Sequence, residues 1–125
     1  MILITGGAYQ GKLDFAKRAF GVSEGDVTYC TEETENISDA KVICGLEKMV
    51  LGFVERGADA EQFVVENLEK MRDKIIIADD VSRGLVPLDK VERAFRETNG
   101  RCLNVIAKAA DEVYVVFCGI ENRIK

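Results

Sequence analysis

The chain has 125 residues, a length that fits one domain and leaves little room for a second. Its 47% hydrophobic and 31% charged residues are typical of a folded globular domain rather than a disordered segment. The net charge of -5, without a basic run, disfavours nucleic acid as a partner, because an anionic surface repels a phosphate backbone.

The N-terminal run Met1–Thr5 is apolar but lacks a basic lead-in and a long apolar core, so it does not resemble a signal peptide. No apolar run reaches the length of a membrane span, and we expect a cytoplasmic protein. The four cysteines form no C-x-x-C pair and the chain contains no histidine, which disfavours a zinc site. We expect buried, reduced thiols.

Four apolar runs predict strands, and helical patterns separate them. The predicted strands are Met1–Thr5, Val27–Thr31, Lys74–Ala78 and Glu112–Cys118. The predicted helices are Lys12–Phe20 (stopped by Gly21), 39–56 (capped by Ser38), Ala60–Arg72, Leu88–Thr98 (opened by Pro87 and broken near Gly100) and Cys102–Ala110. The alternation predicts one α/β domain, residues 1–125, with three layers and a mainly parallel sheet.

The most informative motif is a glycine-rich loop between the first strand and the first helix. It consists of Gly6, Gly7, Ala8, Tyr9, Gln10, Gly11, Lys12 and Leu13, and matches G-x-x-x-x-G-K. The glycines allow backbone N–H groups to surround phosphate oxygens, and the helix offers its positive N-terminal end. We expect this loop to bind the phosphates of a nucleotide, with Lys12 reaching them from the exposed surface of an empty site.

One position departs from that motif. Leu13 stands where Ser or Thr would supply a hydroxyl ligand to Mg²⁺, and a leucine cannot bind a hard cation. The sequence therefore predicts phosphate binding but leaves Mg²⁺ placement, and hence phosphoryl transfer, open.

Two carboxylates follow the third predicted strand. Asp79 and Asp80 would lie at the carboxyl edge of the sheet, near the glycine-rich loop, where they could hold Mg²⁺ directly or through water. An equally good interpretation is that these two residues have a structural role alone, ending the strand or capping a helix. Asp80 is the candidate general base for a phosphoryl transfer, and Lys12 is the other candidate catalytic residue.

Taken in order, these motifs resemble the adenosylcobinamide kinase/adenosylcobinamide-phosphate guanylyltransferase family of cobalamin biosynthesis. The resemblance lies in the loop and in five later segments: 79–87, with the sequence DDVSRGLVP, then 95–97 (FRE), 100–104 (GRCLN), 110–113 (ADEV) and the ending 119–125 (GIENRIK). It implies binding of GTP or ATP with Mg²⁺, adenosylcobinamide as a substrate, and a homo-oligomer. It also implies that Tyr29-Cys30-Thr31 corresponds to a family segment in which Thr31 is a nucleotide contact.

The middle of the chain departs from this family. Family members are longer and use a histidine to accept GMP before its transfer, and this chain has no histidine. A family segment of the type D-C-L-T-L-W has its nearest counterpart at 43–46, without the aspartate. We therefore expect no guanylyl transfer and at most the kinase half. A non-catalytic nucleotide- or partner-binding module remains the alternative, with a generic small-molecule kinase as a third, weaker hypothesis.

Overall fold

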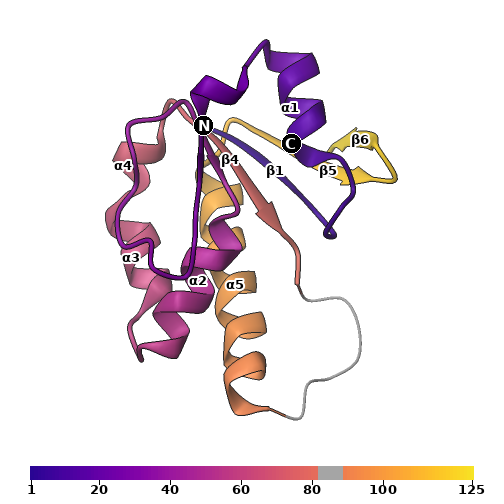
Figure 1. Cartoon of the computed structure of the whole chain (residues 1–125). Helices are drawn as coiled ribbons and strands as arrows, with labels where there is room; N and C mark the ends of the chain where they lie inside the picture. Colours follow the sequence, from indigo (N-terminus) through magenta and orange to yellow (C-terminus); the bar gives the residue numbers. More distant parts are fainter. Residues whose placement is uncertain (82–88) are drawn as a thin grey trace.

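The computed structural model describes residues 1–81 and 89–125, which form one six-stranded sheet with helices on both faces (Figure 1). The strands are β1 (Ile2–Gly6), β2 (Val27–Tyr29), β3 (Val42–Cys44), β4 (Ile75–Asp79), β5 (Glu112–Phe117) and β6 (Ile120–Arg123). Their order across the sheet is β2-β3-β4-β1-β5-β6. All neighbouring pairs are parallel except β5 and β6, which form an antiparallel hairpin. The predicted mainly parallel α/β fold is confirmed.

The helices divide between the two faces of the sheet. Their bounds are α1 (Lys12–Phe20), α2 (Leu46–Glu55), α3 (Ala60–Glu66), α4 (Leu68–Met71) and α5 (Lys90–Ala109), with a short 3-10 turn at Glu24–Asp26. Helix α1 packs Phe15 and Ala16 on one face, against Ile4 and Ile77. Helices α2, α3 and α5 cover the other face and complete the three layers. Within the described ranges, no helix is both long enough and apolar enough to cross a membrane.

Strand β1 lies inside the sheet, between β4 and β5, although both of these strands come much later in the chain. Its residues pair in register with Ile75–Asp79 on one side and with 112–115 on the other. The β1–α1–β2 connection leaves toward one edge of the sheet, whereas the chain after β4 crosses to the other side of β1. Parallel sheets form ligand clefts at such a change of direction, beyond the carboxyl ends of the strands.

The prediction of one long helix from 39 to 56 was wrong. Val42–Cys44 is instead β3, and the helix begins only at Leu46, after Gly45 in the left-handed conformation at φ 80°. Val42 and Ile43 are β-branched residues that fit a helical stripe and a buried strand equally well, so local pattern alone does not decide between them. Pairing with β2 and β4 decides it, because β3 fills the gap between these strands.

Two other predicted helix boundaries were also wrong. Gly100 does not break the last helix, because α5 runs unbroken from Lys90 to Ala109 and capping by Asp89 starts it. The predicted helix 60–72 is divided at Asn67 into α3 and α4. The predicted opening of a helix at Pro87 lies outside the described residues. Packing of Cys102 and Ile106 onto the sheet outweighs the modest cost of one glycine in α5.

Candidate functional site

The glycine-rich loop connects the carboxyl end of β1 to the first turn of α1. Three of its residues have positive φ angles: Gly6 at 147°, Tyr9 at 58° and Gly11 at 89°. Gly6 is required for a second reason, because a Cβ there would lie 2.3 Å from the backbone oxygen of Val116 on β5. The loop therefore leaves the sheet by a path that only glycine permits, and it ends at the positive end of α1.

The turn between β5 and β6 holds the loop from the side. The Gly119 N–H donates to the backbone oxygen of Gln10 at 2.9 Å, and the Cys118 N–H donates to the side-chain oxygen of Gln10 at 2.5 Å. Tyr9, which precedes the anchored Gln10, is fully exposed. The loop is thus fixed at its base while Tyr9 projects into solvent.

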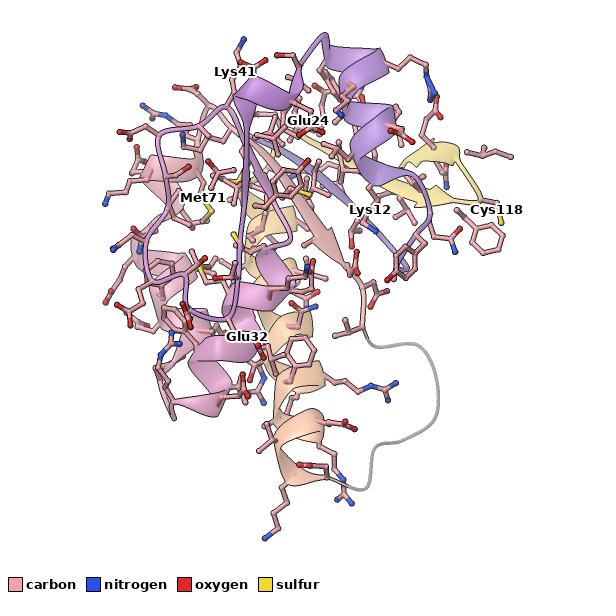
Figure 2. The ribbon with its side chains drawn as sticks, in the orientation of Figure 1. Lys12, Glu24, Glu32, Lys41, Met71 and Cys118 are labelled. Atoms are coloured by element: carbon pink, nitrogen blue, oxygen red, sulfur yellow. The ribbon has the colours of Figure 1, made fainter. Side chains whose placement is uncertain are left out.

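Lys12, the first residue of α1, is buried, with 7% of its surface exposed. Its Nζ donates to the backbone oxygen of Gly7 at 2.6 Å and lies 2.6 Å from Oδ1 of Asp79 at the end of β4. Figure 2 shows Lys12 beside the carboxyl end of that strand. The expectation of an exposed lysine was wrong, because the sheet brings Asp79 next to Gly6 in register and supplies a counter-charge.

A cleft of about 510 Å³ opens at this edge of the sheet. Its walls come from the loop and first turn of α1, from the ends of β2, β3 and β4, and from the start of α2. The lining residues are Ala8, Tyr9, Gln10, Gly11, Lys12, Leu13, Asp14, Tyr29, Cys30, Cys44, Gly45, Glu47, Lys48, Ile77 and Asp79. A volume of this size accommodates a small organic ligand.

Sequence reasoning missed Glu47, the second residue of α2. It is buried, with 7% of its surface exposed, and its Oε1 accepts a hydrogen bond from the Asp79 N–H at 2.8 Å. Burial raises the pKa of its carboxyl group, the nearby Asp79 charge adds to the rise, and the hydrogen bond from Asp79 and the charge of Lys12 oppose it. A single glutamate on an amphipathic helix gives no sequence signal that distinguishes a cleft residue from a solvated one.

The structure brings most of the predicted nucleotide residues to this cleft, but not all of them. Residues 8–13 and Asp79 line it, and Gly6 and Gly7 form the entrance to the loop. Asp80 is half-buried and does not line it, and its backbone N–H donates to the Gly6 oxygen at 2.7 Å. Thr31 lies in an exposed turn, where its Oγ1 accepts from the Glu33 N–H at 3.2 Å, and is also absent from the lining.

Two cysteines line the cleft from neighbouring strand ends. Burial is the main cause that raises the pKa of both the Cys30 and the Cys44 thiol to about 11. Both are therefore protonated at neutral pH, and neither is an activated nucleophile. In the described part of the chain, no group of three or more histidine, cysteine or acidic side chains is arranged to hold a metal ion by itself.

These features define a three-layer α/β protein whose cleft combines a glycine-rich loop, a helix N-terminus, a lysine and an aspartate at the carboxyl edge of the sheet. A family model described as cobinamide kinase / cobinamide phosphate guanyltransferase matches residues 46–124, which is more than half of the chain. The chain belongs to this family, as the resemblance of its motifs predicted.

Two curated relatives support the assignment. The bifunctional adenosylcobalamin biosynthesis protein CobU of Salmonella typhimurium strain LT2 is 35% identical over 74 residues, and its namesake of Escherichia coli strain K12 is 32% identical over 74 residues. In both cases the match covers 58% of this chain and 41% of the relative. The chain thus spans less than half the length of these relatives, and the family-model match begins after the glycine-rich loop.

Proposed function

We propose that this protein binds GTP or ATP in the cleft, through residues 6–12, and acts in cobalamin biosynthesis. The observation that carries the proposal is the position of Lys12, which stands at the positive end of α1 inside the cleft and opposite Asp79. Family membership supports the same conclusion independently, because the family-model match covers a different part of the chain.

Nucleotide binding would require an exchange of partners at Lys12. In the present arrangement its ammonium group contacts the Gly7 oxygen and the Asp79 carboxylate, so incoming phosphate oxygens would compete with both. Backbone N–H groups of the loop and the first turn of α1 would supply the remaining donors. The positive φ angles of Gly6, Tyr9 and Gly11 bend the backbone of the loop between β1 and α1.

The chemistry of the side chains in the cleft is compatible with a nucleotide-bound Mg²⁺ ion. Asp79 offers a carboxylate at the position opposite the loop, whereas Leu13 offers no ligand and packs partly against the apolar cluster under α1. Mg²⁺ commonly takes one or two carboxylates and completes its shell with phosphate oxygens and water. When bound, it would neutralise charge on the transferring phosphate.

Any enzyme activity would be the kinase half of the family reaction, the phosphorylation of adenosylcobinamide. Glu47 and Asp79 are carboxylates that line the cleft, whereas Asp80, our candidate base for the substrate hydroxyl, directly follows Asp79 without lining it. Guanylyl transfer through a histidine adduct is not expected, because the chain has no histidine. The family resemblance also implies a homo-oligomer, which sedimentation equilibrium would test.

The alternative is a non-catalytic nucleotide- or partner-binding module. Leu13 in place of a hydroxyl ligand is the observation that favours it. Calorimetric titration with GTP and with ATP, with and without Mg²⁺, tests the binding proposal. Saturable binding supports it, and absence of binding to either nucleotide in both conditions contradicts it. Turnover of adenosylcobinamide to its phosphate would then distinguish a kinase from a binding module.

A further inference from the structure

The cleft contains a buried acidic group that the function proposed above leaves unused. Among the described residues, the buried polar or charged side chains are Lys12, Glu47 and Asn99, and Glu47 is the one carboxylate in this set. Burying a carboxylate is costly unless a counter-charge or several hydrogen bonds compensate. Its position therefore needs an explanation beyond helix packing.

The contacts of Glu47 compensate its negative charge only in part. Oε1 accepts the Asp79 N–H, but no lysine or arginine of the described ranges forms an ion pair with Glu47. The nearest buried cation, Lys12, is 2.6 Å from Asp79 instead. The carboxylates of Glu47 and Asp79 thus share the ammonium group of Lys12, which leaves one negative charge uncompensated next to a loop suited to phosphates.

We propose that Glu47, together with Asp79, ligates a divalent hard cation such as Mg²⁺ in this cleft and supplies the protein ligand that Leu13 does not. The proposal rests on nucleotide binding as proposed above. Glu47 lies on α2, across the cleft from α1, yet it is tied through the Asp79 backbone to the strand end nearest Lys12. One oxygen is fixed by that hydrogen bond, so the carboxylate is held in place and a cation would bind a preformed group.

Charge balance gives the reason why a cation is needed. A nucleoside triphosphate would bring several negative charges to a cleft already lined by three acidic residues, Asp14, Glu47 and Asp79, and by two lysines, Lys12 and Lys48. The exposed Lys48 at the cleft wall is screened by solvent and offsets this poorly. A divalent ion between the phosphates and the carboxylates of Glu47 and Asp79 would turn this repulsion into attraction.

The test uses Glu47→Gln, which keeps an oxygen to accept the Asp79 N–H and removes only the charge. Affinity for GTP is measured by calorimetry with Mg²⁺ and with EDTA, and Mn²⁺ binding is measured by electron paramagnetic resonance with and without GTP. We expect the metal-linked gain in affinity to fall about tenfold or more in the variant. Affinity in EDTA should stay unchanged or increase, because a repelling charge is gone. Glu61→Gln, the second residue of α3 and outside the cleft, is the matched control.

A purely structural role for Glu47 predicts a different result. If Glu47→Gln keeps the parental metal-linked gain and Mn²⁺ affinity, the proposal is overturned and Glu47 only anchors β4 to α2. If the parent binds no nucleotide, the proposed function fails, but Mn²⁺ titration of the nucleotide-free protein still decides about the metal. Loss of Mn²⁺ binding in Glu47→Gln then supports the proposal, and absence of Mn²⁺ binding by the parent refutes it.

Discussion

Lys12 Nζ lies 2.6 Å from Asp79 Oδ1, and this contact joins the first residue of α1 to the last residue of β4. The two residues are 67 positions apart in sequence (79 minus 12). The contact brings together two motifs that are separate in the sequence, the glycine-rich loop and the acidic strand end. It also buries a cation that motif reasoning placed on an open surface.

Replacement of this lysine, Lys12→Ala, should weaken binding of GTP or ATP by about 1.5–3 kcal/mol, the scale of a hydrogen bond to a charged group. Because Lys12 is buried and paired with Asp79, the variant should also lose stability, by about 1–3 kcal/mol after allowance for the partial exposure of Asp79. Calorimetry and urea unfolding measure the two effects. Lys17→Ala, on an exposed part of the same helix, is the control for lost charge. Equal nucleotide affinity of variant and parent would rule out the phosphate role.

Substitution of the residue after this lysine, Leu13→Ser, should restore a hydroxyl at the usual Mg²⁺ position and increase the Mg²⁺ dependence of nucleotide binding. The structure adds a cost, because Leu13 is half-buried and packs against the apolar cluster under α1. We expect a loss of about 1–3 kcal/mol in unfolding free energy, less than for a fully buried leucine. A folded variant without any metal-linked gain would show that the site lacks more than this one ligand.

Glu47 predicts a pH dependence of stability. Its pKa is raised in the folded state by burial, above the ordinary value of 4.5, so the folded protein binds more protons than the unfolded chain between these two pKa values. Stability from this group is fully present below pH 4.5 and is lost as pH rises through the raised pKa. Asp79 strengthens this trend, whereas Lys12 weakens it.

Comparison of parent and Glu47→Gln isolates this effect from other titrating groups. As pH rises above the ordinary glutamate range, the unfolding free energy of the variant should increase relative to that of the parent. This difference should grow until Glu47 is fully ionised in the folded parent. Urea unfolding at several pH values between 4 and 8, the span in which carboxylates and raised carboxylates titrate, gives both curves. Parallel curves would mean that Glu47 is not desolvated in solution.

Gly6→Ala tests the entry into the loop. The added Cβ would lie 2.3 Å from the Val116 oxygen, and φ at this position is 147°, so we expect a loss of about 3 kcal/mol or more. Gly100→Ala is a matched control with the opposite sign, because Gly100 lies within α5 with nothing near its added Cβ. It should stabilise the protein by about 0.5–1 kcal/mol. Thermal or urea unfolding of both variants checks the contrast.

The protein should form no covalent GMP adduct. Histidine suits this chemistry because its neutral imidazole is nucleophilic near neutral pH, and the chain contains none. Incubation with α-labelled GTP and Mg²⁺, followed by denaturation, measures retained label. Stoichiometric label on the chain would contradict the prediction and point to a lysine nucleophile. Lys48, at the cleft wall, would be the first to test, since Lys12 is engaged by Asp79.

The sequence by itself determined the start of the fold. Strand β1, the glycine-rich loop and α1 were predicted to within a residue or two, and Gly21 ends α1 as expected, with its N–H bonded to the Lys17 oxygen. These features depend on local causes: an apolar run, left-handed glycines and a helical stripe. Local signals also predicted the parallel sheet. The sequences of β4 and β5 contain unbroken apolar runs, which indicate strands buried on both faces.

Only the tertiary structure decided which elements became neighbours and which charges were buried. Val42 and Ile43 fit both a helical and a strand periodicity. They form strand β3 because they pair with β2 on one side and with β4 on the other. The exposed strand β6 has no apolar pattern, and its antiparallel contact with β5 defines it. Glu47 became a cleft residue because α2 starts beside the end of β4, where the Asp79 N–H needs an acceptor. Such long-range pairings leave no trace in local periodicity, since each depends on a partner many residues away.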